Sequence, residues 1–122
     1  MDTTKEYIKM CEKAKEIQKS FQSLHDTINH PHNLYIDRNT YKVESFNNYK
    51  HRNNIWLPRQ DQLQEMVSSR NAYNLMLIFE LWYDKHCGDD SEYEYGSMEQ
   101  LWLAFVMKEK YQKQWDGEKW TR

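Results

Sequence analysis

The strongest pattern in this 122-residue chain is an apolar stripe near its N-terminus. Its members recur at alternating spacings of three and four, the repeat of one face of an α-helix. They are Tyr7, Met10, Ala14, Ile17, Phe21, Leu24 and Ile28. Thr3, with Glu6 three residues later, is expected to cap the helix as a capping box. Because the residue before a proline is disfavoured in the α region, we expect His30 and Pro31 to end it. The stripe therefore predicts one continuous helix that packs on the protein's own core.

Composition agrees with a helical fold. Only three glycines and two prolines interrupt the chain, which favours long helices over a turn-rich β fold. Charged residues make up 30%, yet five Trp, nine Tyr and four Phe can bury large areas and supply most of a core. The length leaves room for one domain. We therefore expect a single compact domain over residues 1–122.

The middle of the chain changes to a strand-like pattern. The segments 34–36 and 41–43 are apolar or alternating and flank the turn-like segment 37–40, which predicts a short β-hairpin. The segment 55–57 is a possible third short strand, in which we expect Trp56 and Leu57 to be structural. Pro58 is expected to be the first residue of the next helix, because proline suits that position.

The second half of the chain predicts two further long helices. Residues 72–86 are apolar nearly all round, which is typical of a central, buried helix. Ser97 and Gln100 predict a second capping box before a last helix that reaches Trp115 and stops at Asp116 and Gly117. The expected fold is mainly α with a small β-hairpin (α+β). Three to four helices surround the central helix, and a two- or three-stranded β element separates the first helix from the second.

The sequence contains two clusters of potential metal ligands, and neither meets the requirements of a metal site. His25, His30 and His32 could bind zinc or nickel, but a structural zinc site needs four ligands and the cysteines are distant. The second cluster is a group of four acidic residues, which lacks the ligands at alternating positions and the glycine at the turn that a calcium-binding loop has. These residues are Asp89, Asp90, Glu92 and Glu94. We expect an exposed helix end and a solvated acidic loop, with no metal and no cofactor.

No catalytic constellation is apparent, so we do not expect an enzyme. Cys87 follows His86, but neighbouring residues on a helix point about 100° apart and do not face each other. Cys11 and Cys87 are expected to be free thiols in a reducing cytoplasm. The apolar run from Leu75 to Phe79 is too short to span a bilayer, and no secretory signal is apparent at the N-terminus.

The most suggestive surface pattern lies between Tyr35 and Arg59. Five basic residues against Asp37 and Glu44 give a local charge of +3. The basic residues are Arg38, Lys42, Lys50, Arg52 and Arg59, and they interleave with Tyr35, Tyr41, Phe46, Tyr49 and Trp56. Basic charge with stacking surfaces is typical of single-stranded nucleic-acid binders. Residues 80–99 carry seven acidic residues and one lysine, which gives this segment a charge of −6. A chain with one basic and one acidic segment is equally suited to docking on a protein with the opposite charge pattern.

Three segments, taken together, resemble a set of small uncharacterised proteins encoded by phages and prophages of Gram-positive bacteria. They are YIKMCEKA at 7–14, IWLPRQDQLQEM at 55–66 and SMEQLWLAFVMKEKY at 97–111, the last followed by WDGE at 115–118. The similarity covers about half of the chain, whereas residues 20–54 depart from the family pattern, which has a Trp-Pro and Gly-Asp loop after the first helix. The resemblance implies a phage setting and no known activity, so no catalytic residue is carried over.

The expected function is that of a non-catalytic phage or prophage accessory protein in the bacterial host cytoplasm. Its expected partner is a host or phage protein, and inhibition of a host defence system is one specific form of this function. The alternative is a small nucleic-acid-binding regulator that uses residues 35–59. No membrane association is expected, and the oligomeric state is left open. Arg59, Gln60 and Gln62 are expected to project into solvent near a helix N-terminus. The other expected partner-binding residues are Arg38, Tyr41, Lys42 and Arg52.

Overall fold

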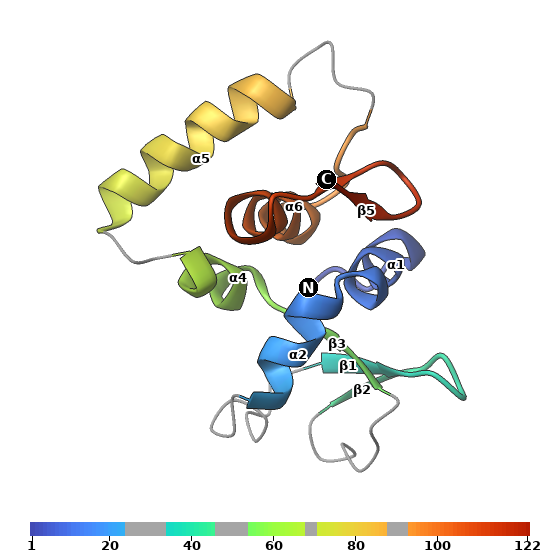
Figure 1. The fold of residues 1–122 in the computed structure, drawn as a ribbon. Helices are drawn as coiled ribbons and strands as arrows, with labels where there is room; N and C mark the ends of the chain where they lie inside the picture. Colours follow the sequence, from blue (N-terminus) through green and yellow to red (C-terminus); the bar gives the residue numbers. More distant parts are fainter. Residues whose placement is uncertain (24–33, 46–53, 68–70, 88–92) are drawn as a thin grey trace. The chain divides into compact units, whose positions relative to one another are not determined.

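The computed structural model describes residues 1–23, 34–45, 54–67, 71–87 and 93–122 (Figure 1). Several sequence predictions fall outside these residues: the helix end at His30 and Pro31, the histidine cluster, Lys50, Arg52 and most of the acidic loop. The described residues form five helices and five short strands, which confirms a mainly α fold with a small β element. The chain divides into two compact units, Met1–Arg59 and Gln60–Arg122. A single domain over residues 1–122 stays a prediction.

The first unit begins with helices α1 (Lys5–Lys13) and α2 (Lys15–Ser23). The cap of α1 is Thr4, not Thr3 as predicted, because the Thr4 hydroxyl accepts a hydrogen bond from the Tyr7 backbone N–H at 3.3 Å. The stripe is buried as predicted at each member whose burial the structure describes. These are Tyr7, Met10, Ala14 and Ile17.

The prediction of one continuous helix is wrong at Ala14, where the backbone leaves the helical region (φ −85°, ψ 73°). In an uninterrupted helix the carbonyl of Cys11 would accept from the backbone N–H of Lys15. Here the side-chain amide of Gln18 donates to that carbonyl at 3.1 Å. The chain therefore bends at Ala14 while the Cys11 carbonyl keeps a hydrogen-bond partner.

A three-stranded antiparallel sheet completes the first unit: β1 (Leu34–Asp37), β2 (Val43–Ser45) and β3 (Asn54–Leu57), in the order β2-β1-β3. Both the hairpin and the third strand are confirmed. Strand β3 packs against α1 and α2, and Trp56 and Leu57 are buried in agreement with their expected structural role. The Tyr7 hydroxyl donates to the backbone carbonyl of Pro58 at 2.6 Å, which fixes the chain just after β3.

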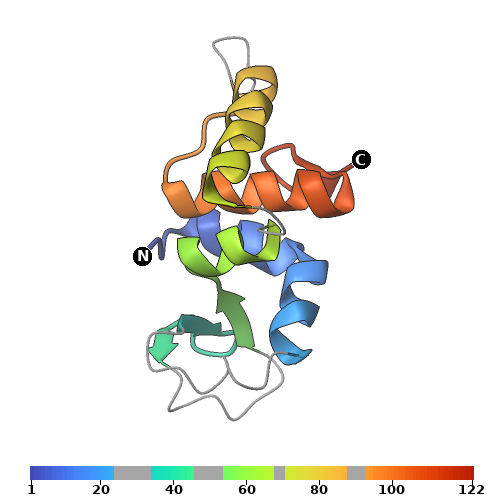
Figure 2. The ribbon, with the colours of Figure 1, turned by 90° about the vertical axis from the view of Figure 1, so that its left-hand side faces the viewer.

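The second unit comprises α4 (Gln60–Val67), α5 (Ala72–His86), α6 (Met98–Tyr111), β4 (Gln114–Trp115) and β5 (Trp120–Thr121). Its central element is α6, in which every residue from Trp102 to Met107 is buried. Helix α4 packs along α6, and α5 crosses α6 steeply (Figure 2). The prediction that residues 72–86 form the central buried helix is therefore wrong, because α6 occupies that place and only one side of α5 meets it.

Both ends of α6 are well defined. Ser97 caps it as predicted, since its hydroxyl accepts from the Gln100 backbone N–H at 3.1 Å. The predicted stop at Asp116 and Gly117 is wrong, because Gln112 adopts a left-handed conformation (φ 55°) directly after Tyr111. Trp115 then lies in β4 and pairs with Trp120 of β5. Asp116 closes the connecting turn by accepting from the backbone N–H groups of Glu118 and Lys119, both at 2.8 Å.

The start of α4 also differs slightly from prediction. The helix begins at Gln60 rather than at Pro58, so both Pro58 and Arg59 precede it. A difference of two residues is common at a helix end.

Candidate functional site

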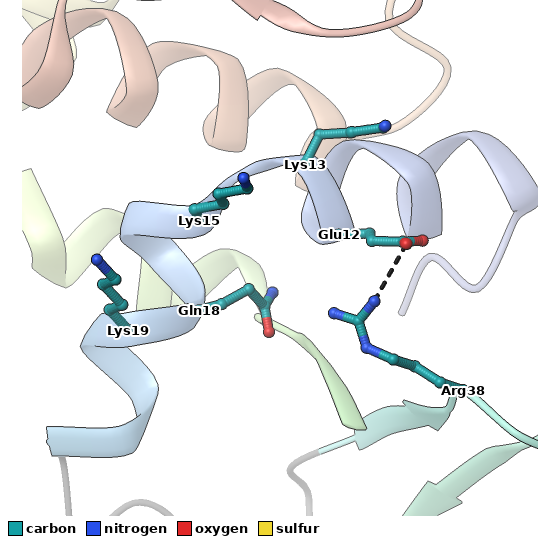
Figure 3. Close-up of a pocket in the computed structure, with 6 residues that line it drawn as sticks. All are labelled: Glu12, Lys13, Lys15, Gln18, Lys19 and Arg38. Carbon is teal, nitrogen blue, oxygen red and sulfur yellow. Dashed lines mark hydrogen bonds and ion pairs between the residues drawn. The ribbon is translucent and has the colours of Figure 1, made fainter. Parts of the chain in front are cut away.

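A polar pocket of about 340 Å³ lies in the first unit, at the junction of α1 and α2 (Figure 3). It is lined by Glu12, Lys13, Lys15, Gln18, Lys19 and Arg38. The first five come from the two helices, and Arg38 comes from the turn that follows β1. The bend at Ala14 separates Lys13 from Lys15, and both lysines still border the same pocket.

Two of the lining side chains, Arg38 and Gln18, are fixed by hydrogen bonds. Nη1 of Arg38 lies 3.1 Å from Oε1 of Glu12, and Figure 3 shows these side chains pointing toward one another. Gln18 is fixed at both ends of its amide, since Oε1 accepts from the Trp56 N–H at 2.8 Å and Nε2 donates to the Trp56 carbonyl at 3.0 Å. The Gln18 side chain is therefore a rigid wall rather than an available hydrogen-bonding group.

The pocket carries a net positive charge. Four cationic side chains against the carboxylate of Glu12 give +3. Lys13, Lys15 and Lys19 are exposed and make no ion pair with the residues that the structure describes. The turn that supplies Arg38 also places Tyr41 and Lys42 in solvent. Tyr41 has a left-handed backbone (φ 55°), and its N–H donates to the Asp37 carbonyl at 2.7 Å.

The structure places the predicted partner-binding residues in two groups. Arg38, Tyr41 and Lys42 share the β1–β2 turn and are exposed, whereas Arg52 lies outside the described residues. Arg59 and Gln60 are only half-buried. The expectation that Gln62 projects into solvent is wrong, because its side chain is buried with 9% exposure. Helix α4 turns Gln62 and Leu63 inward together, so a polar residue type did not mark an exposed face here.

Sequence reasoning missed an exposed apolar surface on α5, which holds five of the large exposed apolar side chains of the described residues. Tyr73 (72% exposed) and Leu81 (69%) mark a face that also contains Met76, Leu77 and Tyr83. The opposite side of the helix faces α6, where Phe79 stacks on Trp102 with ring centroids 4.2 Å apart and Trp82 is buried. A helix that is apolar all round looks fully buried in sequence, so the pattern concealed this exposure.

The cysteine thiols lack the features of nucleophiles. Burial raises the pKa of Cys11, outweighing the opposing hydrogen bond with Tyr7. Burial also raises the pKa of Cys87 to about 11, so its thiolate is scarce at neutral pH. Both thiols are free.

No group of three or more His, Cys, Asp or Glu side chains within the described ranges could hold a metal ion. Among the described helices, none combines the length and apolar character needed to cross a bilayer.

Comparison of the chain with protein-family models, with curated proteins and with solved structures gives no match.

Proposed function

We propose that this chain is a non-catalytic binding protein, a phage or prophage accessory protein whose partner is another protein, and that α5 supplies the contact surface. The observation that supports this most directly is the exposed apolar face of α5. Contiguous exposed apolar patches on small proteins are uncommon and mark interaction sites.

The α5 face has the geometry of a helix-docking surface. Tyr73, Met76, Leu77 and Leu81 are spaced by three, one and four residues, which places them on one side of a helix. The other side is anchored by Phe79, whose ring contacts Trp102 and also lies 5.2 Å from the Phe105 ring. The exposed face is therefore presented on a helix whose other side contacts α6 through aromatic rings.

The charges on this face define the chemistry of the partner. Glu80 and Asp84 are exposed and fall among the apolar side chains of the same face. Complementary charge contributes specificity at interfaces, so the partner should offer apolar side chains beside lysine or arginine. A basic amphipathic helix meets both requirements. Nucleic acid does not suit this face, because its phosphates would meet two carboxylates.

The proposal can be tested with two fluorescently labelled helical peptides, one of leucine and lysine and one of leucine and glutamate. Anisotropy should show binding of the basic peptide alone. Leu77→Asp with Leu81→Asp should weaken it at least about tenfold, the equivalent of about 1.4 kcal/mol. Because both side chains are exposed, the melting temperature should stay unchanged.

A charge reversal sharpens the test. Glu80→Lys with Asp84→Lys should transfer the preference to the acidic peptide. The matched control, Glu94→Lys with Glu109→Lys, changes the net charge by the same amount at exposed positions outside α5 and should keep the original preference. Equal binding of both peptides by every variant would refute a specific α5 surface. Light scattering tests whether the α5 face instead binds a second copy of the chain. A dimer that is lost in the Leu77→Asp with Leu81→Asp variant would assign the face to a second copy and would also refute the proposal.

A further inference from the structure

The pocket at the α1–α2 junction has a property that protein binding through α5 does not use. Its lining carries +3, and three of its four cations, Lys13, Lys15 and Lys19, have no ionic partner among the described residues. These four cationic side chains line one pocket, and a bound anion would interact favourably with each of them. We propose that this pocket binds the phosphate group of a phosphorylated ligand.

The side chains in the pocket suit phosphate chemistry. Lysine ammonium groups act as mobile point charges toward phosphate, and an arginine guanidinium offers paired N–H donors that match two phosphate oxygens. The contact between Arg38 and Glu12 involves Nη1. A guanidinium has five N–H donors, so Arg38 can bind phosphate while it stays attached to Glu12. A doubly charged phosphate also offsets the excess of +3 better than a single carboxylate does.

The volume is consistent with a small phosphorylated group. About 340 Å³ is at the low end of the range for ligand pockets. Gln18 limits the pocket on one side, and its amide is occupied by the Trp56 backbone and by the Cys11 carbonyl. Recognition therefore depends on the four cations, which predicts strong sensitivity to charge and to salt.

Glu12 has two opposing effects in this arrangement. Its carboxylate orients Arg38, and the same negative charge repels an incoming phosphate. Glu12→Gln keeps an oxygen that can accept from Arg38 and raises the charge of the lining from +3 to +4. The site therefore predicts that removal of this carboxylate strengthens phosphate binding.

Titration calorimetry with inorganic pyrophosphate at low salt tests the proposal. We expect a dissociation constant below about 1 mM, weakened at least about tenfold in Lys15→Gln with Lys19→Gln. Glu12→Gln should bind several-fold more tightly. The matched control, Lys85→Gln with Lys110→Gln, removes the same charge from exposed positions of the second unit and should bind like the parent. Absence of binding, or an equal loss in the control, would overturn the proposal.

A second titration identifies the source of the phosphate. The titration uses a labelled single-stranded oligonucleotide. A nucleic-acid backbone is identified as the source if the oligonucleotide binds, if pyrophosphate displaces it, and if Lys15→Gln with Lys19→Gln weakens its binding. Pyrophosphate binding without oligonucleotide binding would identify a small phosphorylated molecule. The α5 variants lie in the other unit and should not alter either titration, so failure of this proposal and failure of protein binding through α5 are separable.

Discussion

The side-chain amide of Gln18 pairs with both backbone polar groups of Trp56, as a neighbouring strand would. The Trp56 N–H donates to Gln18 Oε1 at 2.8 Å, and Gln18 Nε2 donates to the Trp56 carbonyl at 3.0 Å. Strand β3 is an edge of the three-stranded sheet that the described residues form, and the Gln18 amide makes the two hydrogen bonds to Trp56 that a further strand would make. The same Nε2 also donates to the Cys11 carbonyl at 3.1 Å, so one side chain joins α1, α2 and β3.

Gln18→Ala should destabilise the first unit. The substitution leaves the N–H and carbonyl of Trp56 without their side-chain partner, and Trp56 is buried. We expect the free energy of unfolding to fall by about 1–3 kcal/mol, the usual cost of unsatisfied buried polar groups. Lys19→Ala, at the next and exposed position, should change it by less than about 0.5 kcal/mol. Urea unfolding followed by tryptophan fluorescence measures both, and equal stabilities of the two variants would contradict this role for Gln18.

The two sides of α5 should respond differently to truncation. Phe79→Ala removes the ring that stacks on Trp102 and approaches Phe105 and Trp82. Because Phe79 is only half-buried, we expect a loss of about 2–3 kcal/mol, below the usual range for fully buried aromatics. Leu81→Ala on the exposed side serves as the control and should be nearly neutral. A larger loss for Leu81→Ala than for Phe79→Ala would mean that the exposed side had been assigned wrongly.

The two thiols should differ in reactivity toward a disulfide reagent. Cys11 is buried and should not react in the native state, whereas half-buried Cys87 should react slowly. Because burial raises the pKa of Cys87 to about 11, its rate should rise about tenfold per pH unit through pH 8 to 10. Cys87→Ser should therefore abolish the native-state reaction. Rapid labelling of that variant at pH 7.5 would contradict the burial of Cys11.

Stability should also depend on pH through Cys11. Burial raises the pKa of this thiol above its ordinary value, so the unfolded chain loses the proton first as the pH rises. The contribution to stability is present in full below about pH 8.5, the ordinary thiol pKa, and is lost progressively above it. Cys11→Ala should reduce this alkaline loss in urea melts between pH 7.5 and pH 10. An unchanged alkaline slope would show that Cys11 ionisation is not its cause.

His86 should titrate below the ordinary range for histidine. Burial, followed by the charges of Lys108 and Lys85, lowers the pKa of His86, and its Nδ1 lies 3.1 Å from Nε2 of Gln114. Because the native state binds this proton more weakly than the unfolded chain, the associated stability is present above about pH 6.5 and falls as the pH drops below it. Lys108→Gln should raise the pKa of His86 in an NMR titration, whereas Lys119→Gln should not. A pKa that Lys108→Gln leaves unchanged would contradict the charge effect.

Sequence periodicity and residue type determined the local elements well. The apolar stripe predicted buried Tyr7, Met10 and Ile17, and the strand-like segments around the turn predicted β1 and β2. The apolar segment 55–57, offered as a possible third strand, is β3. Ser97 predicted the start of α6, because a hydroxyl at that position accepts from a backbone N–H three residues later. These features depend on interactions between near neighbours in the chain, which a sequence pattern reports directly.

The tertiary structure decided what depends on distant partners. The break at Ala14 accompanies two hydrogen bonds between Gln18 and the backbone of Trp56, 38 residues away, and no pattern near residue 14 indicates them. The burial of Gln62 follows from the packing of α4 against α6. The phosphate pocket needs Arg38 beside Glu12, 26 residues apart. Helices α5 and α6 are both rich in apolar residues, and only packing makes α6 central and leaves one face of α5 in solvent, because burial is a property of the neighbours and not of the helix itself.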